Sequence, residues 1–232
     1  YRFGGLALGA SDGKLDGVLK QVQLGAYAAQ CQRFLNAAPS NFGASVGDSI
    51  SCCPTSSIPG WVNFANQTWA TGSRLQTSSL AKGGAYTGAG ISNNNALYQW
   101  TNFVRGKNYG VLFVLAGVND IKSGLNMTTA LANLTQIWDE ARADRLQLVV
   151  MTLTPCSSNA GWNGAKQTQL ETLNTAIRAY AAAHPGVILV DLYNSALRDG
   201  TALAAAYDSG DGLHPNAAGS ALIASLVTAG RP

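Results

Sequence analysis

The sequence is poor in charge and has no long apolar run. Only 12% of its 232 residues are charged, about half the usual share, and the net charge is +3. Because the few Lys and Arg residues stand singly, no basic stripe is present and we expect no nucleic-acid partner. No apolar run approaches the roughly 18–20 residues of a membrane-spanning helix, so we expect no membrane span. The hydrophobic share of 47% is ordinary for a globular protein with a neutral surface.

Cysteine and histidine are also scarce. The chain has two histidines and four cysteines, none of them in CxxC spacing: Cys31, Cys52, Cys53 and Cys156. A zinc site of the usual kind needs more such ligands, so we expect no metal. Low charge and an even cysteine number favour an oxidising compartment, and we expect an extracellular, secreted protein. The sequence leaves the disulfide pairing open.

Apolar runs alternate with stretches of helical periodicity. The runs typical of buried parallel strands are 111–115, 146–152 and 187–191, with a weaker one at 41–46. The stretches with apolar residues at helical spacing are 130–145, 170–183 and 217–229. Strands that alternate with helices of this length predict an α/β fold, a three-layer α/β/α sandwich with a central parallel sheet.

The first 40 residues fit this pattern less well. Val18, Val22 and Cys31 fit one face of a helix, whereas Val18, Val22 and Leu24 fit strand alternation. Gly25 weakens both interpretations. We therefore predict an N-terminal extension or embellishment over residues 1–40, and the sandwich as a single domain over 41–232.

Three polar groups follow the predicted strands. Ser49 follows the weak strand, Asn119 follows 111–115, and Asp211 and His214 precede the last helix. In open α/β sheets, functional residues collect beyond the carboxyl ends of the strands. A serine hydroxyl becomes a strong nucleophile when a histidine takes its proton, and an Asp three residues before the His can reach the imidazole Nδ1. The pattern is typical of a serine hydrolase.

Each of these residues also has an ordinary explanation. A Ser in a Gly-Asp-Ser turn commonly caps a helix, and an Asn after glycine commonly lies in a turn. A His before Pro is usually a surface loop residue, as we expect for the second histidine, His184. Their joint occurrence at strand ends favours the functional interpretation.

The three groups together resemble a known family. The segments 47–50 (Gly-Asp-Ser-Ile), 117–120 (Gly-Val-Asn-Asp) and 211–216 (Asp-Gly-Leu-His-Pro-Asn) resemble the first, third and last sequence blocks of the SGNH hydrolases, the GDSL esterase/lipase superfamily. The resemblance covers roughly residues 41–227. The first block is weak alone, but the three in order are specific.

The resemblance implies a catalytic arrangement that needs no metal and no organic cofactor. Ser49 would be the nucleophile, His214 the base and Asp211 the residue that orients it. The oxyanion hole would consist of the backbone N–H of Ser49, the N–H of Gly84 and the side-chain amide of Asn119. Such donors stabilise the negative charge that acyl transfer places on the former carbonyl oxygen.

The second sequence block departs from the family pattern. The family has an Asn-x-Gly-like segment, whereas residues 81–90 here read Ala-Lys-Gly-Gly-Ala-Tyr-Thr-Gly-Ala-Gly. Gly83, Gly84 and Gly88 all compete for the oxyanion role. We choose Gly84 because it lies 35 positions after Ser49, the most family-like separation. The segment could equally be a plain flexible turn.

A rival nucleophile exists at Ser11, in a degenerate copy of the first block. It would lie 108 positions before Asn119, beyond the usual layout. The helix expected at 61–65 also favours Ser49.

Other residues near these motifs receive supporting roles. Asp48 and Asp120 are expected to buttress their loops rather than take part in the chemistry. Cys52 and Cys53 are expected to pack or to form a disulfide near the site entrance. The candidate pocket aromatics are Tyr86, Trp162 and Tyr207.

The sequence thus predicts a serine esterase that cleaves carboxylic esters through an acyl-enzyme. The neutral surface and the lack of an amphipathic lid argue against a long-chain lipase, and resemblance to carbohydrate-active members suggests acetyl esters on carbohydrate. We expect a small-molecule or polysaccharide ester as partner; the oligomeric state is open. The alternatives are a thioesterase or lysophospholipase, and a non-catalytic carbohydrate-binding module on this fold.

Overall fold

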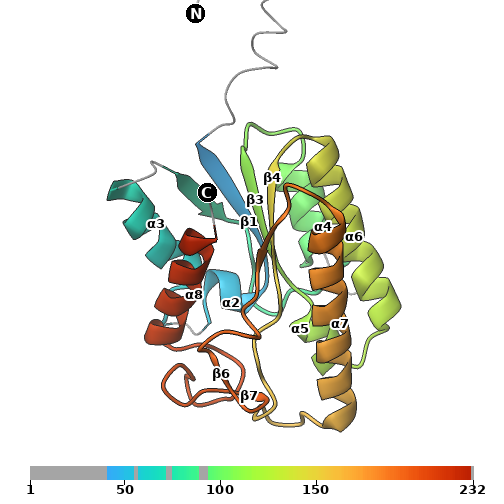
Figure 1. The fold of residues 1–232 in the computed structure, drawn as a ribbon, viewed down its shortest axis with the longest axis vertical. Helices are drawn as coiled ribbons and strands as arrows, with labels where there is room; N and C mark the ends of the chain where they lie inside the picture. The colour runs from blue at the N-terminus through green and yellow to red at the C-terminus, as the bar shows by residue number, and fades with distance from the viewer. Residues whose placement is uncertain (1–40, 55–56, 72–74, 89–93, 231–232) are drawn as a thin grey trace, which may run out of the picture. The chain divides into compact units, whose positions relative to one another are not determined.

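The computed structural model describes residues 41–54, 57–71, 75–88 and 94–230, so the predicted extension over residues 1–40 lies outside the described residues. One parallel sheet has the strand order β2-β1-β3-β4-β5 (Figure 1). Its strands are β1 (Phe42–Gly47), β2 (Gln76–Ser79), β3 (Val111–Leu115), β4 (Gln147–Met151) and β5 (Ile188–Val190).

Helices cover both faces of this sheet, which makes a three-layer α/β/α sandwich (Figure 1). Helices α3 (Trp61–Thr71) and α8 (Ala217–Ala229) pack together on one face. The other face carries α4 (Ala96–Gln99), α6 (Met127–Ala143) and α7 (Gly164–Ala183). The shorter elements are α2 (Ser49–Cys52), the π-helical turn η1 (Trp100–Val104), α5 (Val118–Lys122) and the antiparallel pair β6 (Arg198–Asp199) and β7 (Ala202–Leu203). None of the helices in the described ranges is long and apolar enough to cross a bilayer.

The predicted fold class is confirmed, and the strongly apolar elements agree closely with their predicted bounds. Strand β3 and helix α8 begin and end where the sequence pattern places them. Helices α6 and α7 begin three and six residues earlier than the apolar periodicity indicated, because Asn126 and Asn163 cap them with side-chain oxygens that accept backbone N–H groups. Strand β2, α4 and η1 were not predicted.

The core lies between the sheet and the two helical layers. All five residues of β3 are buried, as expected for a central strand covered on both faces. The Phe113 ring meets the Trp61 indole of α3 edge-on, with ring centroids 5.4 Å apart. On the opposite layer, α6 buries Leu134, Ile137 and Trp138 at helical spacing. Apolar packing thus holds the central strands rigidly.

The strand order reverses beside the carboxyl end of β1. The chain passes from β1 to β2 on one side and then crosses to β3 on the other. In open α/β sheets, ligands bind at such a reversal, beyond the carboxyl ends of the strands. Ser49 follows β1 and Asn119 follows β3, so both lie at this edge of the sheet.

Truncation of the central phenylalanine tests this account of the core. We expect Phe113→Ala to lower the free energy of unfolding by about 3–5 kcal/mol, because it opens a cavity beside Trp61. The matched control is Phe103→Ala on η1, whose side chain is 43% exposed, and we expect it to cost far less. Chemical denaturation measures both. Equal losses in the two variants would contradict the assignment of Phe113 to the core.

Candidate functional site

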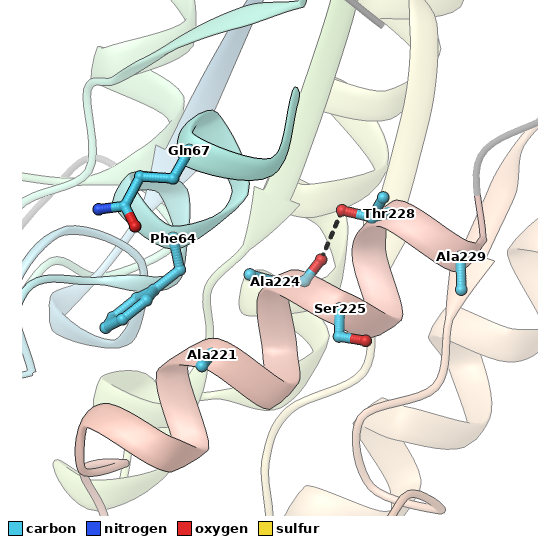
Figure 2. A pocket seen from close by; sticks show the side chains of 7 residues that line it. All are labelled: Phe64, Gln67, Ala221, Ala224, Ser225, Thr228 and Ala229. Atoms are coloured by element: carbon cyan, nitrogen blue, oxygen red, sulfur yellow. Dashed lines mark hydrogen bonds between the residues drawn. The ribbon is translucent and has the colours of Figure 1, made fainter. Parts of the chain in front are cut away.

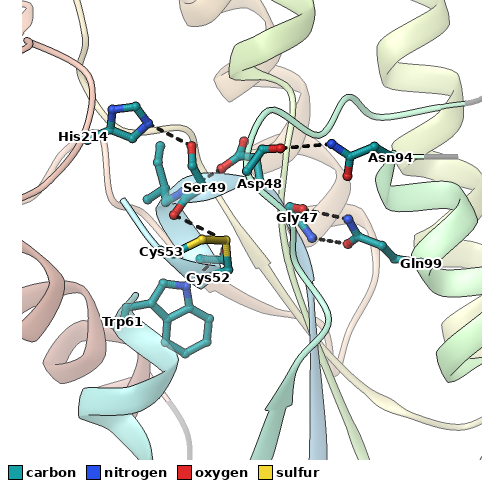
Figure 3. Close-up of a disulfide and its surroundings, with 12 residues drawn as sticks. Gly47, Asp48, Ser49, Cys52, Cys53, Trp61, Asn94, Gln99 and His214 are labelled. Carbon is teal, nitrogen blue, oxygen red and sulfur yellow. Dashed lines mark hydrogen bonds between the residues drawn. A yellow bond between two sulfur atoms is a disulfide. The ribbon is translucent and has the colours of Figure 1, made fainter. Parts of the chain in front are cut away.

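The turn that carries Ser49 begins at Gly47, the last residue of β1. Gly47 has a φ of +152°, and a Cβ there would overlap the Leu115 carbonyl oxygen of β3. Glycine tolerates both the conformation and the close approach. From another direction, the Gln99 side chain accepts the Gly47 N–H at 2.8 Å and donates to the Gly47 carbonyl at 3.0 Å (Figure 3). These contacts fix the backbone directly before Ser49.

Helix α2 then begins at Ser49 itself. Asp48 is the N-cap, and its Oδ1 accepts the Ile50 N–H at 3.0 Å. The first N–H groups of a helix have no acceptor within the helix, and the Ser49 N–H donates to no other described residue. The Ser49 residue is 9% exposed. Its backbone therefore offers an unused donor beside a hydroxyl at the edge of the sheet.

His214 and Asp211 complete a hydrogen-bonded chain with Ser49. The Ser49 Oγ lies 2.9 Å from His214 Nε2, and His214 Nδ1 lies 2.6 Å from Asp211 Oδ2 (Figure 3 shows the first contact). A carboxylate can only accept, so Nδ1 carries the imidazole proton and Nε2 is left to accept from the serine hydroxyl. The structure thus brings together three residues that the sequence separates by up to 165 positions.

The Asp211 carboxylate is held by the loop that carries it. Its Oδ1 accepts the backbone N–H groups of His214 at 2.8 Å and of Leu213 at 2.9 Å. Partial burial by itself raises the pKa of Asp211, but these hydrogen bonds and the imidazole outweigh it and leave the pKa below its usual value. Asp211 therefore stays ionised and keeps the imidazole in one tautomer.

A neighbouring loop supports the Asp211–His214 segment from outside. Asn159 Nδ2 donates to the Asp211 carbonyl at 2.8 Å. Gly212 has a φ of +70°, and a Cβ there would overlap the backbone of Ser158. The loop after β4 and the loop before α8 therefore pack tightly, which fixes the imidazole.

Asn119 binds the glycine-rich segment of the second sequence block. Its Nδ2 donates to the Ala85 carbonyl at 2.9 Å, which leaves the second amide hydrogen for another acceptor. Gly84, directly before Ala85, is exposed, has a φ of +72°, and donates its N–H to no other described residue. The sequence-predicted donors Gly84 and Asn119 thus lie next to each other.

The three competing glycines have different environments. Gly83 and Gly84 are exposed, with open space where a Cβ would stand. Gly88 is buried, and a Cβ there would overlap the Asn133 side-chain amide of α6. Gly88 therefore has a packing reason to be glycine. Of the two exposed glycines, Gly84 directly precedes the residue that Asn119 binds.

Comparison with known proteins decides the family. The GDSL-like lipase/acylhydrolase family matches residues 45–222, which is more than half of the chain and includes the segments that carry Ser49, Asn119 and His214. The chain belongs to this family. It is therefore an ester hydrolase by family.

Solved structures share the fold of this chain. A GDSL-like lipase from Bacteroides thetaiotaomicron has a TM-score of 0.66 at 19% identity, over 88% of this chain and 95% of its own. The lipase/acylhydrolase from Enterococcus faecalis has a TM-score of 0.66 at 20% identity, over 81% and 93%. At these identities the likeness concerns the fold. No curated protein sequence matches the chain.

The predicted pocket aromatics lie on three different loops of this GDSL-like hydrolase. Tyr86 directly follows Ala85, and its hydroxyl lies 3.2 Å from Ser123 Oγ. The Trp162 indole donates to Gln167 Oε1 at 3.2 Å, on α7. The Tyr207 carbonyl accepts the Asn216 N–H within the loop that carries His214. Tyr86 is the one whose neighbour contacts Asn119.

The cysteines after Ser49 pair with each other, as one of the two expectations had it. Cys52, the last residue of α2, forms a disulfide with Cys53 (Figure 3). The Cys53 N–H donates to the Ser49 carbonyl at 2.9 Å, so this pair also closes the last turn of α2. Cys156 is buried as a free thiol, and burial raises its pKa far above the usual value. Cys31 lies outside the described residues.

Two buried carboxyls lie directly beside site residues. Asp48 is fully buried, and burial, opposed by the Ile50 N–H and assisted by the charge of Asp120, raises its pKa to about 7. Burial likewise raises the pKa of Asp120, although hydrogen bonds from Thr87 oppose the shift. Asp48 caps α2 and Asp120 holds a loop, contacts of the buttressing kind that the sequence suggested.

A cavity of about 550 Å³ lies elsewhere, between α3 and α8 (Figure 2). It is lined by Phe64, Gln67, Ala221, Ala224, Ser225, Thr228 and Ala229. None of the site residues belongs to this lining, so the cavity is separate from the Ser49 site. Within the described parts of the chain, no three His, Cys, Asp or Glu side chains gather as metal ligands would.

Three positioning residues were missed from the sequence. Gln99 holds Gly47, Thr87 binds Asp120, and Asn133 packs where Gly88 lacks a side chain. Gln99 lies 52 positions from Gly47, and no local pattern marks such a contact. Thr87 and Asp120 lie 33 positions apart, and no local pattern marks their contact either.

The buried Asp48 carboxyl predicts a pH-dependent stability. Its pKa is about 7 in the fold against an ordinary 3.8, so the folded chain retains a proton that the unfolded chain has lost between these values. Ionisation of Asp48 therefore favours unfolding. The stability that the protonated Asp48 carboxyl gives the fold is present below about pH 4 and is lost as the pH rises to about 7. The Asp48→Asn variant has no carboxyl to ionise and so lacks this pH-dependent loss. The melting temperature of the variant minus that of wild type should therefore increase by several degrees from pH 4 to pH 8.

Thermal denaturation at several pH values measures this difference. The control is Asp144→Asn at the exposed end of α6, where the pH dependence should stay that of wild type. Parallel curves for wild type and Asp48→Asn would contradict the assigned titration.

Proposed function

We propose that the chain is a serine esterase that works through an acyl-enzyme on Ser49. The observation that carries the proposal is the hydrogen-bonded chain from Ser49 Oγ through His214 to Asp211, at 2.9 and 2.6 Å. This is the arrangement that activates a serine hydroxyl, with the nucleophile in reach of a base and the base oriented by a carboxylate.

In the proposed reaction, Ser49 Oγ attacks the ester carbonyl while its proton passes to His214 Nε2. The resulting oxyanion would accept hydrogen bonds from the Ser49 N–H, the Gly84 N–H and the Asn119 amide. The alcohol leaves with the proton from Nε2, and the acyl group stays on Ser49. A water molecule then gives a proton to His214 Nε2 and attacks the acyl carbonyl. The bond between the acyl carbon and Ser49 Oγ breaks, His214 returns the proton to Oγ, and the acid is released. No step requires a metal or an organic cofactor.

We further propose short acyl groups, most simply acetyl, on a carbohydrate alcohol. Support comes from the neutral, charge-poor sequence and from the Tyr86–Ser123 pair beside the Asn119 loop, which offers a ring and hydroxyls of the kind that contact sugars. An extracellular location fits the Cys52–Cys53 disulfide, because disulfides persist in oxidising compartments.

Hydrolysis of p-nitrophenyl esters by matched serine variants tests the proposal. Ser49→Ala should lower kcat/KM for the acetate by at least about 10³-fold, because it removes the nucleophile. Ser225→Ala on α8 is the exposed control, and Ser11→Ala tests the rival nucleophile. Loss in Ser11→Ala alone, or equal rates in all four proteins, would contradict the role of Ser49.

The acyl-chain profile distinguishes the proposed substrate from its alternatives. We expect the native chain to prefer acetate over butyrate and octanoate, and to release acetate from an acetylated xylan. Preference for octanoate or for an acyl thioester would favour a lysophospholipase or thioesterase instead. Binding of the glycan without hydrolysis of any ester would favour a carbohydrate-binding module.

A further inference from the structure

Asp120 uses both of its carboxylate oxygens on one residue of the glycine-rich segment. Oδ2 accepts the Thr87 N–H at 3.0 Å, and Oδ1 accepts the Thr87 hydroxyl at 2.7 Å. Both residues are buried: Thr87 is 0% exposed and Asp120 is 4% exposed. Charged hydrogen bonds in such a place are stronger than those at a surface, so this contact fixes Thr87 relative to α5.

The residue before Asp120 binds the same segment two positions earlier. Asn119 Nδ2 donates to the Ala85 carbonyl at 2.9 Å. Consecutive residues of α5 thus hold alternate residues of the segment. Gly84 directly precedes Ala85, so the position of its N–H relative to the Asn119 amide depends on these three hydrogen bonds.

Helix α6 and α4 support Thr87 from behind. Asn133 Nδ2 donates to Thr87 Oγ1 at 3.3 Å, and Gly88 lacks the Cβ that would displace Asn133. The Leu97 N–H donates to the Thr87 carbonyl at 3.0 Å. Every polar group of Thr87 therefore has a partner, and the segment is braced on several sides.

The chemistry of the contact requires a carboxylate at position 120. Thr87 presents two donors, an N–H and an O–H, to two different oxygens of one side chain. An ionised carboxyl accepts at both oxygens, whereas an amide would set an NH₂ group against one of the donors. Asp120→Asn therefore changes the contact with almost no change of volume.

We propose that Asp120 is a positioning residue that sets the distance between the Gly84 and Asn119 oxyanion donors. This inference rests on the proposed function of the site. Asp120 itself touches neither Ser49 nor the substrate in this account; it acts through Thr87 and the segment that carries Gly84. Donors misplaced by about 1 Å cost about 10²-fold in rate, because they must meet the oxyanion at 2.7–3.1 Å.

Kinetics of Asp120→Asn, Thr87→Val and Thr87→Ser test the inference. We expect the first two to lower kcat for p-nitrophenyl acetate by about 10–100-fold with KM within about twofold, because the donors act mainly in the transition state. Affinity for phenylboronic acid, which forms a tetrahedral adduct on the serine, should fall by a similar factor.

Thr87→Ser keeps both donors and should restore most of kcat. The loss of kcat in Asn119→Ala shows the effect of removing one oxyanion donor outright, for comparison. Asp144→Asn, at an exposed position, is the control and should leave kcat unchanged.

The outcomes separate the inference from the proposed function. A native chain without esterase activity, or an active Ser49→Ala variant, contradicts the proposed function itself. Unchanged kcat in Asp120→Asn and Thr87→Val beside an inactive Ser49→Ala overturns the inference alone. The inference is also overturned if kcat falls while KM rises by a similar factor, or if kcat falls while the affinity for phenylboronic acid stays unchanged. If Asp120→Asn does not fold by circular dichroism, Thr87→Val, which keeps the carboxylate, decides between the same outcomes.

Discussion

The close approach of β1 to β3 at Gly47 is the constraint on which the site depends. The Leu115 carbonyl occupies the space that a Cβ at position 47 would need, and Gln99 binds both the N–H and the carbonyl of Gly47. A larger residue would push the two central strands apart. Because Ser49 lies two residues later at the start of α2, any such shift would move its hydroxyl away from His214. Packing of the sheet and the position of the Ser49 hydroxyl therefore depend on the same contact.

The site joins the two ends of the described domain. Ser49 follows the first strand, whereas His214 precedes the last helix, and one hydrogen bond of 2.9 Å connects them. That contact has no local support, so it depends on the tight packing of the Asp211–His214 loop against the loop after β4. By contrast, the Asp211–His214 contact spans three residues and is fixed within its own turn. The serine–histidine contact is thus the one most sensitive to movement of the surrounding loops.

The sequence predicts local features of this chain better than distant ones. Strand β3 was predictable because its run is apolar throughout, and Asp211 and His214 because their spacing closes one turn. Strand β2 was not, since its sequence Gln-Thr-Ser-Ser is polar and three of its four residues are exposed at the sheet edge. The Gln99–Gly47 contact joins residues 52 positions apart, which no periodicity reveals. The choice among the three glycines proposed for the oxyanion hole likewise depends on tertiary neighbours such as Asn133.

The central claim is that His214 activates Ser49, and covalent labelling tests it most directly. The native chain and His214→Gln would be treated with a fluorophosphonate, which reacts with activated serines, and the adduct mapped by peptide mass spectrometry. The account predicts one adduct, on Ser49, and a labelling rate lower by about 10²-fold or more in His214→Gln, because the variant lacks the base. An adduct on a different serine, or equal labelling rates in the two proteins, would contradict it.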